Sequence, residues 1–364
     1  MFERVAIIGV GLIGGSLGMA LKRLRLAEEV VGIGRNAEKL QLAVEVGAVD
    51  RVTADLKSVT GAAVVVVATP VSAVIPVVAE AADYFEAGAI VTDVGSVKAA
   101  IVDALQPVAR AHGFHFVGGH PMAGSERTGV KSADPYLFEN AYYILTPTPE
   151  TDRSAVETVA KMAVAVGARV IELDPGEHDL YVAAVSHLPH CVAAALVNTI
   201  AGLPEREAVL PLAAGGFRDT TRVAAGDPEM WRDIVVANRE AILGMIGKYQ
   251  AELALLAALI RTGDGPGVDE WFKKAQALRQ TVPTKSKGYL PELFEIVVTV
   301  PDRPGVIAGL AGVLGENGIN ICDIEILRVR EGEGGTIRLG FASETDQEEA
   351  VRLFREEGIE TRKR

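Results

Sequence analysis

The first half of the chain alternates short Val- and Ile-rich runs with stretches of helical spacing. The run at 64–67 is Val at every position, so a strand there must be buried on both faces. Buried strands that alternate with helices are typical of a parallel sheet with helices on both sides. Residues 1–174 are therefore expected to form an α/β, doubly wound domain. The expected strands are 4–8, 30–33, 64–68, 89–92, 115–117, 142–145 and 169–173, and the first two helices are expected at 12–24 and 37–46.

Beyond residue 174 the pattern changes to helix alone. Ala- and Leu-rich stretches at 192–200 and 251–260 are apolar on more than one face, which is typical of a bundle core or a subunit interface. We expect an all-α domain over 175–285, followed by a linker at 286–291.

Residues 292–364 show a third pattern, β-α-β-β-α with a final strand. The expected strands are 294–300, 318–329, 336–343 and 359–362, and the expected helices are 304–316 and 347–357. This order is that of small ferredoxin-like α+β modules. The length of 364 residues thus resolves into three domains.

Charge and composition exclude several classes of protein. Hydrophobic residues make up 49% of the chain, which is enough to build cores and excludes global disorder. The formal net charge is -12, so neither a nucleic acid nor an anionic membrane is expected as a partner. The almost uncharged stretch 62–82 is broken by Pro70 and Pro76, which predicts a strand, a turn and a helix in place of a membrane span.

Cysteine usage and the N-terminus bear on the compartment. Cys191 and Cys322 lie far apart and have neither disulfide nor metal-ligand spacing, which favours a reducing cytoplasm. The N-terminus passes directly into an apolar strand without a signal-like segment.

A glycine-rich turn follows the first expected strand and opens the first helix. In Gly9-Val10-Gly11-Leu12-Ile13-Gly14, the first glycine allows a tight turn and the second lets the backbone approach a pyrophosphate. The third glycine allows close helix–strand packing, and the helix N-terminus at Leu12 and Ile13 then faces the phosphates. This context predicts a Rossmann-like domain that binds a dinucleotide.

The choice between NAD and NADP stays open. An acid that would hold the ribose is expected near Gly34, at the end of the second strand, but the chain has Gly34-Arg35 there. Arg35 can accommodate a 2′-phosphate, which would favour NADP, or it can stack on adenine, which would favour neither cofactor.

Histidines and arginines cluster in three later segments. His120 lies in a glycine-flanked loop after a strand, where parallel sheets place ligands. His187 and His190 share one helix face beside Pro189, and their spacing without an outside partner argues against a metal site. A glycine-opened loop is expected at 215–222, with two arginines suited to a carboxylate.

Six motifs in order resemble the prephenate dehydrogenases of the tyrosine pathway over roughly residues 1–285, and residues 292–364 resemble an ACT domain, an amino-acid-sensing module. The motifs of the first resemblance are GVGLIGGS at 9–16, ATPV at 68–71, TDVGSVK at 92–98, HPMAG at 120–124, SHLPH at 186–190 and GGFRDTTR at 215–222. Those of the second are VPDRPG at 300–305 and NGINI at 317–321.

The resemblance implies oxidative decarboxylation of prephenate to 4-hydroxyphenylpyruvate, with NAD as cofactor and NADP not excluded. It implies that His120 takes the hydrogen bond or the proton of the C4 hydroxyl, that Ser96 orients His120 or this hydroxyl, and that Arg222 holds a substrate carboxylate. It also implies a homodimer formed by the helical domain. The other implied substrate-binding residues are His187, His190, Glu126, Gly215 and Asp219, and the cofactor-binding residues are Gly9, Gly11, Leu12, Ile13, Gly14, Arg35, Thr69 and Pro70.

For the ACT segment, the resemblance implies tyrosine as a feedback effector; the alternative is a structural appendage. The residues expected near this ligand are Asp302, Arg303, Gly305 and Asn320. For the whole chain, the alternatives are an arogenate or cyclohexadienyl dehydrogenase, a β-hydroxyacid dehydrogenase, and a non-catalytic amino-acid sensor.

Overall fold

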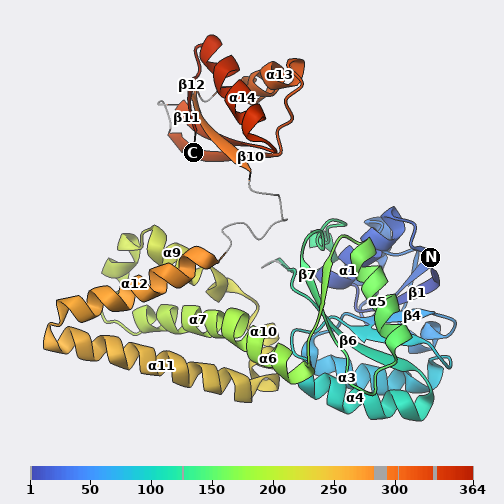
Figure 1. Cartoon of the computed structure of the whole chain (residues 1–364). Coiled ribbons are helices and arrows are strands. Elements are labelled where there is room, and N and C mark those ends of the chain that lie inside the picture. The colour runs from blue at the N-terminus through green and yellow to red at the C-terminus, as the bar shows by residue number, and fades with distance from the viewer. Residues whose placement is uncertain (1, 125–126, 283–292, 302, 331–333, 364) are drawn as a thin grey trace. The chain divides into compact units, whose positions relative to one another are not determined.

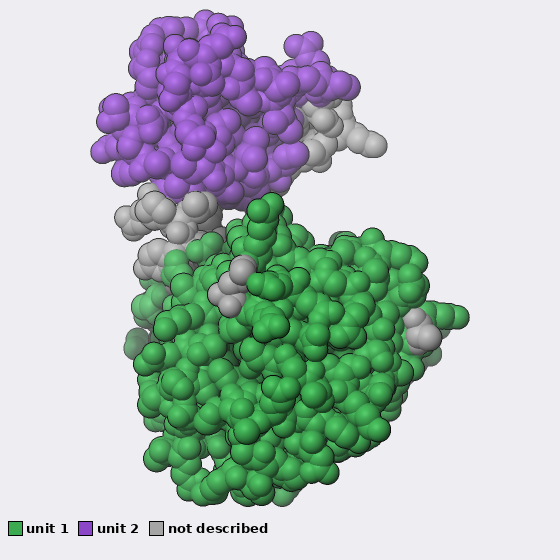
Figure 2. Space-filling view, turned by 90° about the vertical axis from the view of Figure 1, so that its right-hand side faces the viewer, with its two compact units in different colours: residues 1–287 green, residues 288–364 purple. Residues whose placement is uncertain are grey.

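The computed structural model describes residues 2–124, 127–282, 293–301, 303–330 and 334–363. The chain divides into two compact units, Met1–Lys287 and Gly288–Arg364 (Figure 2). The linker expected at 286–291 lies outside the described residues. The first unit holds both the sheet and the helices that were expected as separate domains, so the boundary at residue 174 stays a prediction.

A mainly parallel sheet forms the first half of this unit (Figure 1), with the strand order β3-β2-β1-β4-β5-β6-β7-β8. Because β1 pairs with both β2 and β4, the strand order reverses at this point, which is where doubly wound sheets bind ligands. The predicted Rossmann-like sheet is thereby confirmed. The strands are β1 (Phe2–Ile8), β2 (Ala27–Ile33), β3 (Arg51–Thr53), β4 (Val64–Val67), β5 (Ile90–Asp93), β6 (His115–Pro121), β7 (Tyr142–Thr146) and β8 (Arg169–Glu172).

The sheet differs from the expected one in two places. β7 runs antiparallel to β6, because the only helical segment described between them is a 3-10 turn (η3, Val130–Ser132), whereas a parallel pair requires a long crossover. β3 is also absent from the expected strands, since its three residues are too few to show a pattern.

Two helical layers bury the sheet, as the all-valine β4 requires. Along β1, Val5 and Ile7 pack on one face and Ala6 and Ile8 on the other. The first face is covered by α1 (Leu12–Arg23), α2 (Ala37–Glu45) and α5 (Arg153–Ala165), and the second by α3 (Val71–Ala81) and α4 (Ala99–His112) (Figure 1).

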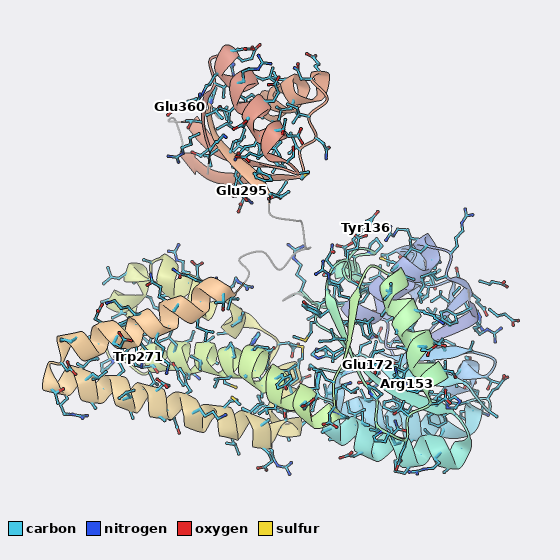
Figure 3. All side chains as sticks on the ribbon, in the orientation of Figure 1. Tyr136, Arg153, Glu172, Trp271, Glu295 and Glu360 are labelled. Atoms are coloured by element: carbon cyan, nitrogen blue, oxygen red, sulfur yellow. The ribbon has the colours of Figure 1, made fainter. Side chains whose placement is uncertain are left out.

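Between β8 and residue 282 the described chain forms helices alone, as predicted. Trp271 of α12, labelled in Figure 3, donates a hydrogen bond from Nε1 to Glu252 of α11 at 3.1 Å. The helices are α6 (Pro175–Val182), α7 (Leu188–Ala201), α8 (Arg206–Val209), α9 (Gly215–Thr221), α10 (Pro228–Ala237), α11 (Arg239–Thr262) and α12 (Gly265–Thr281).

The loop expected at 215–222 is mostly helix. Residues Gly215–Thr221 form α9, and a 3-10 turn (η6, Arg222–Ala225) follows. Thr221 donates its hydroxyl to the carbonyl of Phe217, one turn back, which holds the end of α9. Two glycines at the start of a short helix cost it little propensity compared with the same residues in its middle.

Two apolar helical stretches are poorly covered by the rest of the described chain. Pro175–Ala201 and Arg239–Thr262 have mean hydropathy of 1.6 and 1.3 and are long enough to cross a membrane, although one or two such helices are weak evidence for a span. On α11, Leu243, Leu255 and Ile260 are 60%, 50% and 63% exposed. Exposed apolar surface of this kind is typical of interaction sites.

The second unit is an antiparallel sheet in the order β10-β11-β9-β12 with two helices packed on one face, which confirms the predicted ferredoxin-like α+β module. On its other face, Arg338 of β11 forms ion pairs with Glu295, Asp323 and Glu325; Glu295 is labelled in Figure 3. The elements are β9 (Phe294–Val300), α13 (Val306–Glu316), β10 (Asp323–Arg330), β11 (Gly334–Phe341), α14 (Glu344–Glu356) and β12 (Glu360–Lys363).

Candidate active site

The carboxyl edge of the sheet gathers the predicted cofactor and catalytic motifs. β1, β4, β5 and β6 are parallel neighbours, so the residues that follow them lie along one edge. Gly9 follows β1, Thr69 follows β4, Ser96 follows β5, and His120 lies near the end of β6.

The glycine turn fits a dinucleotide. Gly9 has a φ of +95°, and a Cβ there would lie 2.6 Å from the carbonyl oxygen of Ala68, so only glycine fits. A Cβ on Gly14 would lie 2.2 Å from the oxygen of Gly9, which explains the close helix–strand packing. By contrast, a Cβ on Gly11 meets no described atom within 4 Å. The turn is thus closed on the protein side and open at Gly11.

Two further features leave polar groups available at this turn. Gly11 immediately precedes α1 and has no side chain that could accept from the first N–H groups of the helix, so the helix N-terminus, at Leu12 and Ile13, can face an anion. Thr69 Oγ1 is buried and has no hydrogen-bond partner among the described residues. These groups fit a bound pyrophosphate, and the neighbouring Pro70 immediately precedes α3.

Arg35 lies where the ribose end of such a cofactor is expected. It is exposed and follows β2, and a Cβ on the preceding Gly34 would lie 3.2 Å from Leu40 Cδ2. The placement agrees with either of the two roles considered for Arg35 and leaves the choice of dinucleotide open.

His120 is buried at the end of β6, where a fully buried ion pair secures the strand. Lys98 Nζ pairs with Asp93 and donates a hydrogen bond to the carbonyl of Gly119 at 2.8 Å. Asp93 Oδ1 accepts the backbone N–H of Gly119 at 3.2 Å. Gly119 has room for no side chain, since a Cβ would lie 2.7 Å from the backbone oxygen of Asp93. These contacts fix the backbone immediately before His120.

Beyond His120, two residues of α6 extend the network. His120 Nδ1 lies 2.8 Å from Nε2 of His178, and His178 Nδ1 lies 2.8 Å from Oδ1 of Asp179. Asp179 also accepts the backbone N–H groups of Lys98 and Ala99, at 2.7 and 2.9 Å, where α4 begins. The start of the helical region is therefore joined to the edge of the sheet.

The surroundings of His120 keep its imidazole neutral. Burial holds the pKa of His120 well below 6.5, and the neighbouring His178, Lys98 and His187 lower it further. Burial also lowers the pKa of Lys98, against the attraction of Asp93. A neutral imidazole with an unprotonated nitrogen can accept a proton near neutral pH.

His187 and His190 lie on the helical side of the same network. His187 is buried in a π turn (η4, Ala183–His187) between α6 and α7, and its Nδ1 lies 3.1 Å from Nδ2 of Asn238. Asn238 Nδ2 also donates to the backbone carbonyl of Asp179 at 2.8 Å. Burial lowers the pKa of His187 to about 4, so this ring is also neutral at physiological pH.

Trp231 joins the two histidines. Its ring stacks on His190 at 3.8 Å between centroids and contacts the edge of His187 at 6.1 Å. Its Nε1 is buried without a hydrogen-bond partner among the described residues. The π turn immediately precedes α7, which has Pro189 in its first turn, and such turns are frequent at functional sites.

The remaining predicted site residues are less tightly placed. Gly215, Asp219 and Arg222 are exposed on α9 and η6, which pack against α7, the helix of His190. Ser96 is partly buried after β5. Glu126 lies outside the described residues, so its expected role in substrate binding has no structural account.

In the second unit, the predicted ligand residues flank α13. Gly305, with a φ of +91°, immediately precedes this helix, and Arg303 lies two residues before Gly305. Asn320 follows the helix and donates from Nδ2 to Cys322 Sγ at 3.8 Å. Asp302 lies outside the described residues.

Sequence reasoning missed His178, Asp179, Asn238 and the Asp93–Lys98 pair. Asp93 and Lys98 lie within a motif that the sequence singled out, but pairing between buried charges cannot be inferred from their spacing. His178-Asp179, a titratable pair at a helix start, was the available signal. Across the described part of the chain, no group of three or more His, Cys, Asp or Glu side chains is arranged to hold a metal ion.

The fold and this edge of the sheet define a nucleotide-binding dehydrogenase. The family model for the prephenate dehydrogenase nucleotide-binding domain matches residues 17–172, that for the prephenate dehydrogenase dimerization domain matches 174–292, and that for the ACT domain matches 294–355. The chain belongs to the prephenate dehydrogenase family and carries a C-terminal ACT domain. This membership decides against the β-hydroxyacid dehydrogenase alternative.

Individual relatives agree with the family models. The chain is 37% identical to prephenate dehydrogenase of Bacillus subtilis over 356 residues, which are 96% of this chain and 95% of the relative. The crystal structure of Aquifex aeolicus prephenate dehydrogenase with hydroxyphenyl propionate and NAD+ is 34% identical, with a TM-score of 0.73, and the match covers 78% of this chain and 99% of that one. Synechocystis arogenate dehydrogenase is 33% identical, with a TM-score of 0.68 and coverage of 77% and 100%.

Proposed function

We propose that this enzyme oxidises and decarboxylates prephenate to 4-hydroxyphenylpyruvate, with hydride transfer to NAD and with NADP as the alternative cofactor. The observation that carries the proposal is the buried, neutral His120 on the same sheet edge as the open glycine turn. Family membership supplies the substrate class.

The residues of the chain divide the chemistry between them. A bound nicotinamide would supply the acceptor for the hydride that leaves C4 of prephenate. His120 accepts the proton of the C4 hydroxyl as that carbon becomes a carbonyl, and Ser96 orients the hydroxyl or the imidazole. The ring carboxylate then leaves as CO2, its bonding electrons complete the aromatic ring, and His120 returns the proton to the phenolate oxygen. General-base assistance of this kind contributes about 10²–10⁴-fold to the rate.

Substrate and cofactor are held by separate elements. Arg222 binds a carboxylate of prephenate, and His187, His190, Glu126, Gly215 and Asp219 complete the substrate site. The cofactor is held by Gly9, Gly11, Leu12, Ile13, Gly14, Arg35, Thr69 and Pro70. A cation beside the substrate lets a chain of net charge -12 bind a dianion, because attraction depends on the local charge.

The assembly is proposed to be a homodimer through the helical region. The exposed apolar side chains of α11 support this, since a second copy would cover them. The family model matched there is itself described as a dimerization domain. The free Cys191 and Cys322 agree with the proposed cytoplasmic location.

Tyrosine is proposed as the effector of the ACT unit, bound near Asp302, Arg303, Gly305 and Asn320. We expect deletion of residues 289–364 to abolish tyrosine inhibition while activity persists, since Met1–Lys287 is a compact unit by itself. Identical inhibition of the shortened and full chains would leave the unit a structural role only.

The second candidate is an arogenate dehydrogenase, which the likeness to the Synechocystis enzyme favours. The deciding experiment is a spectrophotometric assay that crosses prephenate and arogenate with NAD and NADP, each with and without tyrosine. Faster reduction with prephenate supports the proposed function, and faster reduction with arogenate supports the alternative. No reduction in any combination would leave the non-catalytic sensor.

A further inference from the structure

The hydrogen bonds that join Asp179, His178 and His120 have a direction fixed at one end. Asp179 Oδ1 accepts the backbone N–H of Lys98 at 2.7 Å, and Oδ2 accepts that of Ala99 at 2.9 Å. Both donors lie at the start of α4, where the helix dipole favours a negative charge. An ionised carboxylate is an acceptor only, so His178 Nδ1, at 2.8 Å, must carry a proton.

The same argument applies to the other nitrogen of the His178 ring. A neutral imidazole that donates from Nδ1 can only accept at Nε2. His178 Nε2 lies 2.8 Å from His120 Nδ1, so the proton between the two rings belongs to His120. In a neutral ring this leaves Nε2 of His120 without a proton.

We propose that His178, held by Asp179, is a positioning residue that keeps His120 in the tautomer with Nε2 free to accept a proton. The inference rests on the proposed function only for the source of that proton, the C4 hydroxyl. The opposite tautomer would place a proton on Nε2, where His120 could donate but not accept.

The arrangement also has a place for the charge that forms. When Nε2 of His120 takes up a proton, the proton on its Nδ1 can pass to Nε2 of His178, so the step moves only protons between ring nitrogens. The positive charge then lies beside the carboxylate of Asp179 and not beside the cationic Lys98. A role limited to capping α4 would need Asp179 but not His178. Substitution of His178 alone therefore separates the tautomer role from the capping role.

Substitution of His178 separates the tautomer role from packing. His178→Leu fills a similar volume but offers no acceptor to His120 Nδ1, and we expect kcat to fall by at least about tenfold while KM for the cofactor changes by less than about twofold. His178→Gln can present its side-chain oxygen near the position of Nε2, and we expect it to retain clearly more activity than the leucine variant. Equal activity of both variants and the wild type would overturn the proposal.

The tautomer itself can be observed in the full-length wild type without substrate. Long-range proton–nitrogen NMR correlations of ¹⁵N-histidine-labelled protein show which ring nitrogen carries the proton, and His120→Asn identifies the signals. We expect a proton on Nδ1 and none on Nε2, with this preference lost in His178→Leu. A proton on Nε2 in the wild type would refute the proposal even if prephenate is oxidised. The expected tautomer in a protein that does not oxidise prephenate would refute the proposed function and leave the proposal standing.

Discussion

His120→Asn removes the proposed proton acceptor while it keeps a hydrogen-bonding group against His178. The asparagine amide nitrogen takes roughly the place of imidazole Nδ1, which lies 2.8 Å from His178 Nε2. Nothing in asparagine reaches the position of imidazole Nε2. The substitution therefore deletes the atom assigned to the chemistry and spares the buried contact beside it.

The expected loss follows from the role of that atom. Loss of general-base assistance lowers kcat by about 10²–10⁴-fold, which corresponds to about 3–5 kcal/mol of transition-state stabilisation. KM for the cofactor should change little, because Gly9 and Gly11 lie in the turn between β1 and α1, Gly14 lies in α1, and none of these described residues is a hydrogen-bond partner of His120. His120→Gln is the matched control: its oxygen can reach the Nε2 position and accept a hydrogen bond, but it is too weak a base to take the proton.

The assay is cofactor reduction by prephenate, followed above pH 6.5, where the depressed pKa keeps the wild-type imidazole neutral. Both variants are expected to lose turnover, with the glutamine variant retaining the lower substrate KM. Turnover of His120→Asn within about twofold of the wild type would refute the assignment of His120 as the base.

Three further predictions come from the same geometry. The kcat/KM profile should hold above pH 6.5 and fall only at lower pH, because the base must be neutral and the pKa of His120 is depressed; an acid limb at or above pH 6.5 would contradict this. Gly9→Ala should destabilise folding by on the order of 2 kcal/mol, because its Cβ would overlap the backbone at a positive φ. Gly11→Ala should leave thermal unfolding unchanged and raise KM for the cofactor roughly tenfold, because its Cβ would point into the open side of the turn. A larger loss of stability in Gly11→Ala than in Gly9→Ala would contradict the assignment of the open and closed sides of the turn. Arg338→Leu should destabilise the second unit by on the order of 2 kcal/mol in denaturant unfolding, since it leaves Glu295, Asp323 and Glu325 together. Arg352→Leu, which removes only the exposed ion pairs with Glu349 and Glu356, should cost clearly less. Equal effects would mean that the Arg338 cluster adds no more stability than exposed ion pairs.

The fold was largely predictable because its signals are local. The β-branched run at Val64–Val67 indicates a strand that is buried on both faces. The glycine turn at Gly9 indicates a backbone conformation that only glycine can adopt. The direction of β7 was not predictable in this way. It depends on whether the preceding connection includes a crossover helix, and the helical segment described there is the three-residue η3.

The site was predictable only in part, because its support is not local. His120 and Gly11 could be named since each lies at a strand end within a short motif. His178 and Asp179 approach His120 from α6, about 60 residues further along the chain, through contacts that no spacing encodes. The loop expected around Arg222 became helix for a related reason: packing against α7 outweighed the weak local preference of two glycines.

The most direct test of the proposed activity is the product balance of the purified full-length protein supplied with prephenate and NAD or NADP. The account predicts one equivalent each of reduced cofactor, CO2 and 4-hydroxyphenylpyruvate for every prephenate consumed, and a loss of all three in parallel in His120→Asn. Prephenate that persists unchanged with either cofactor, or that is consumed without cofactor reduction, would contradict it.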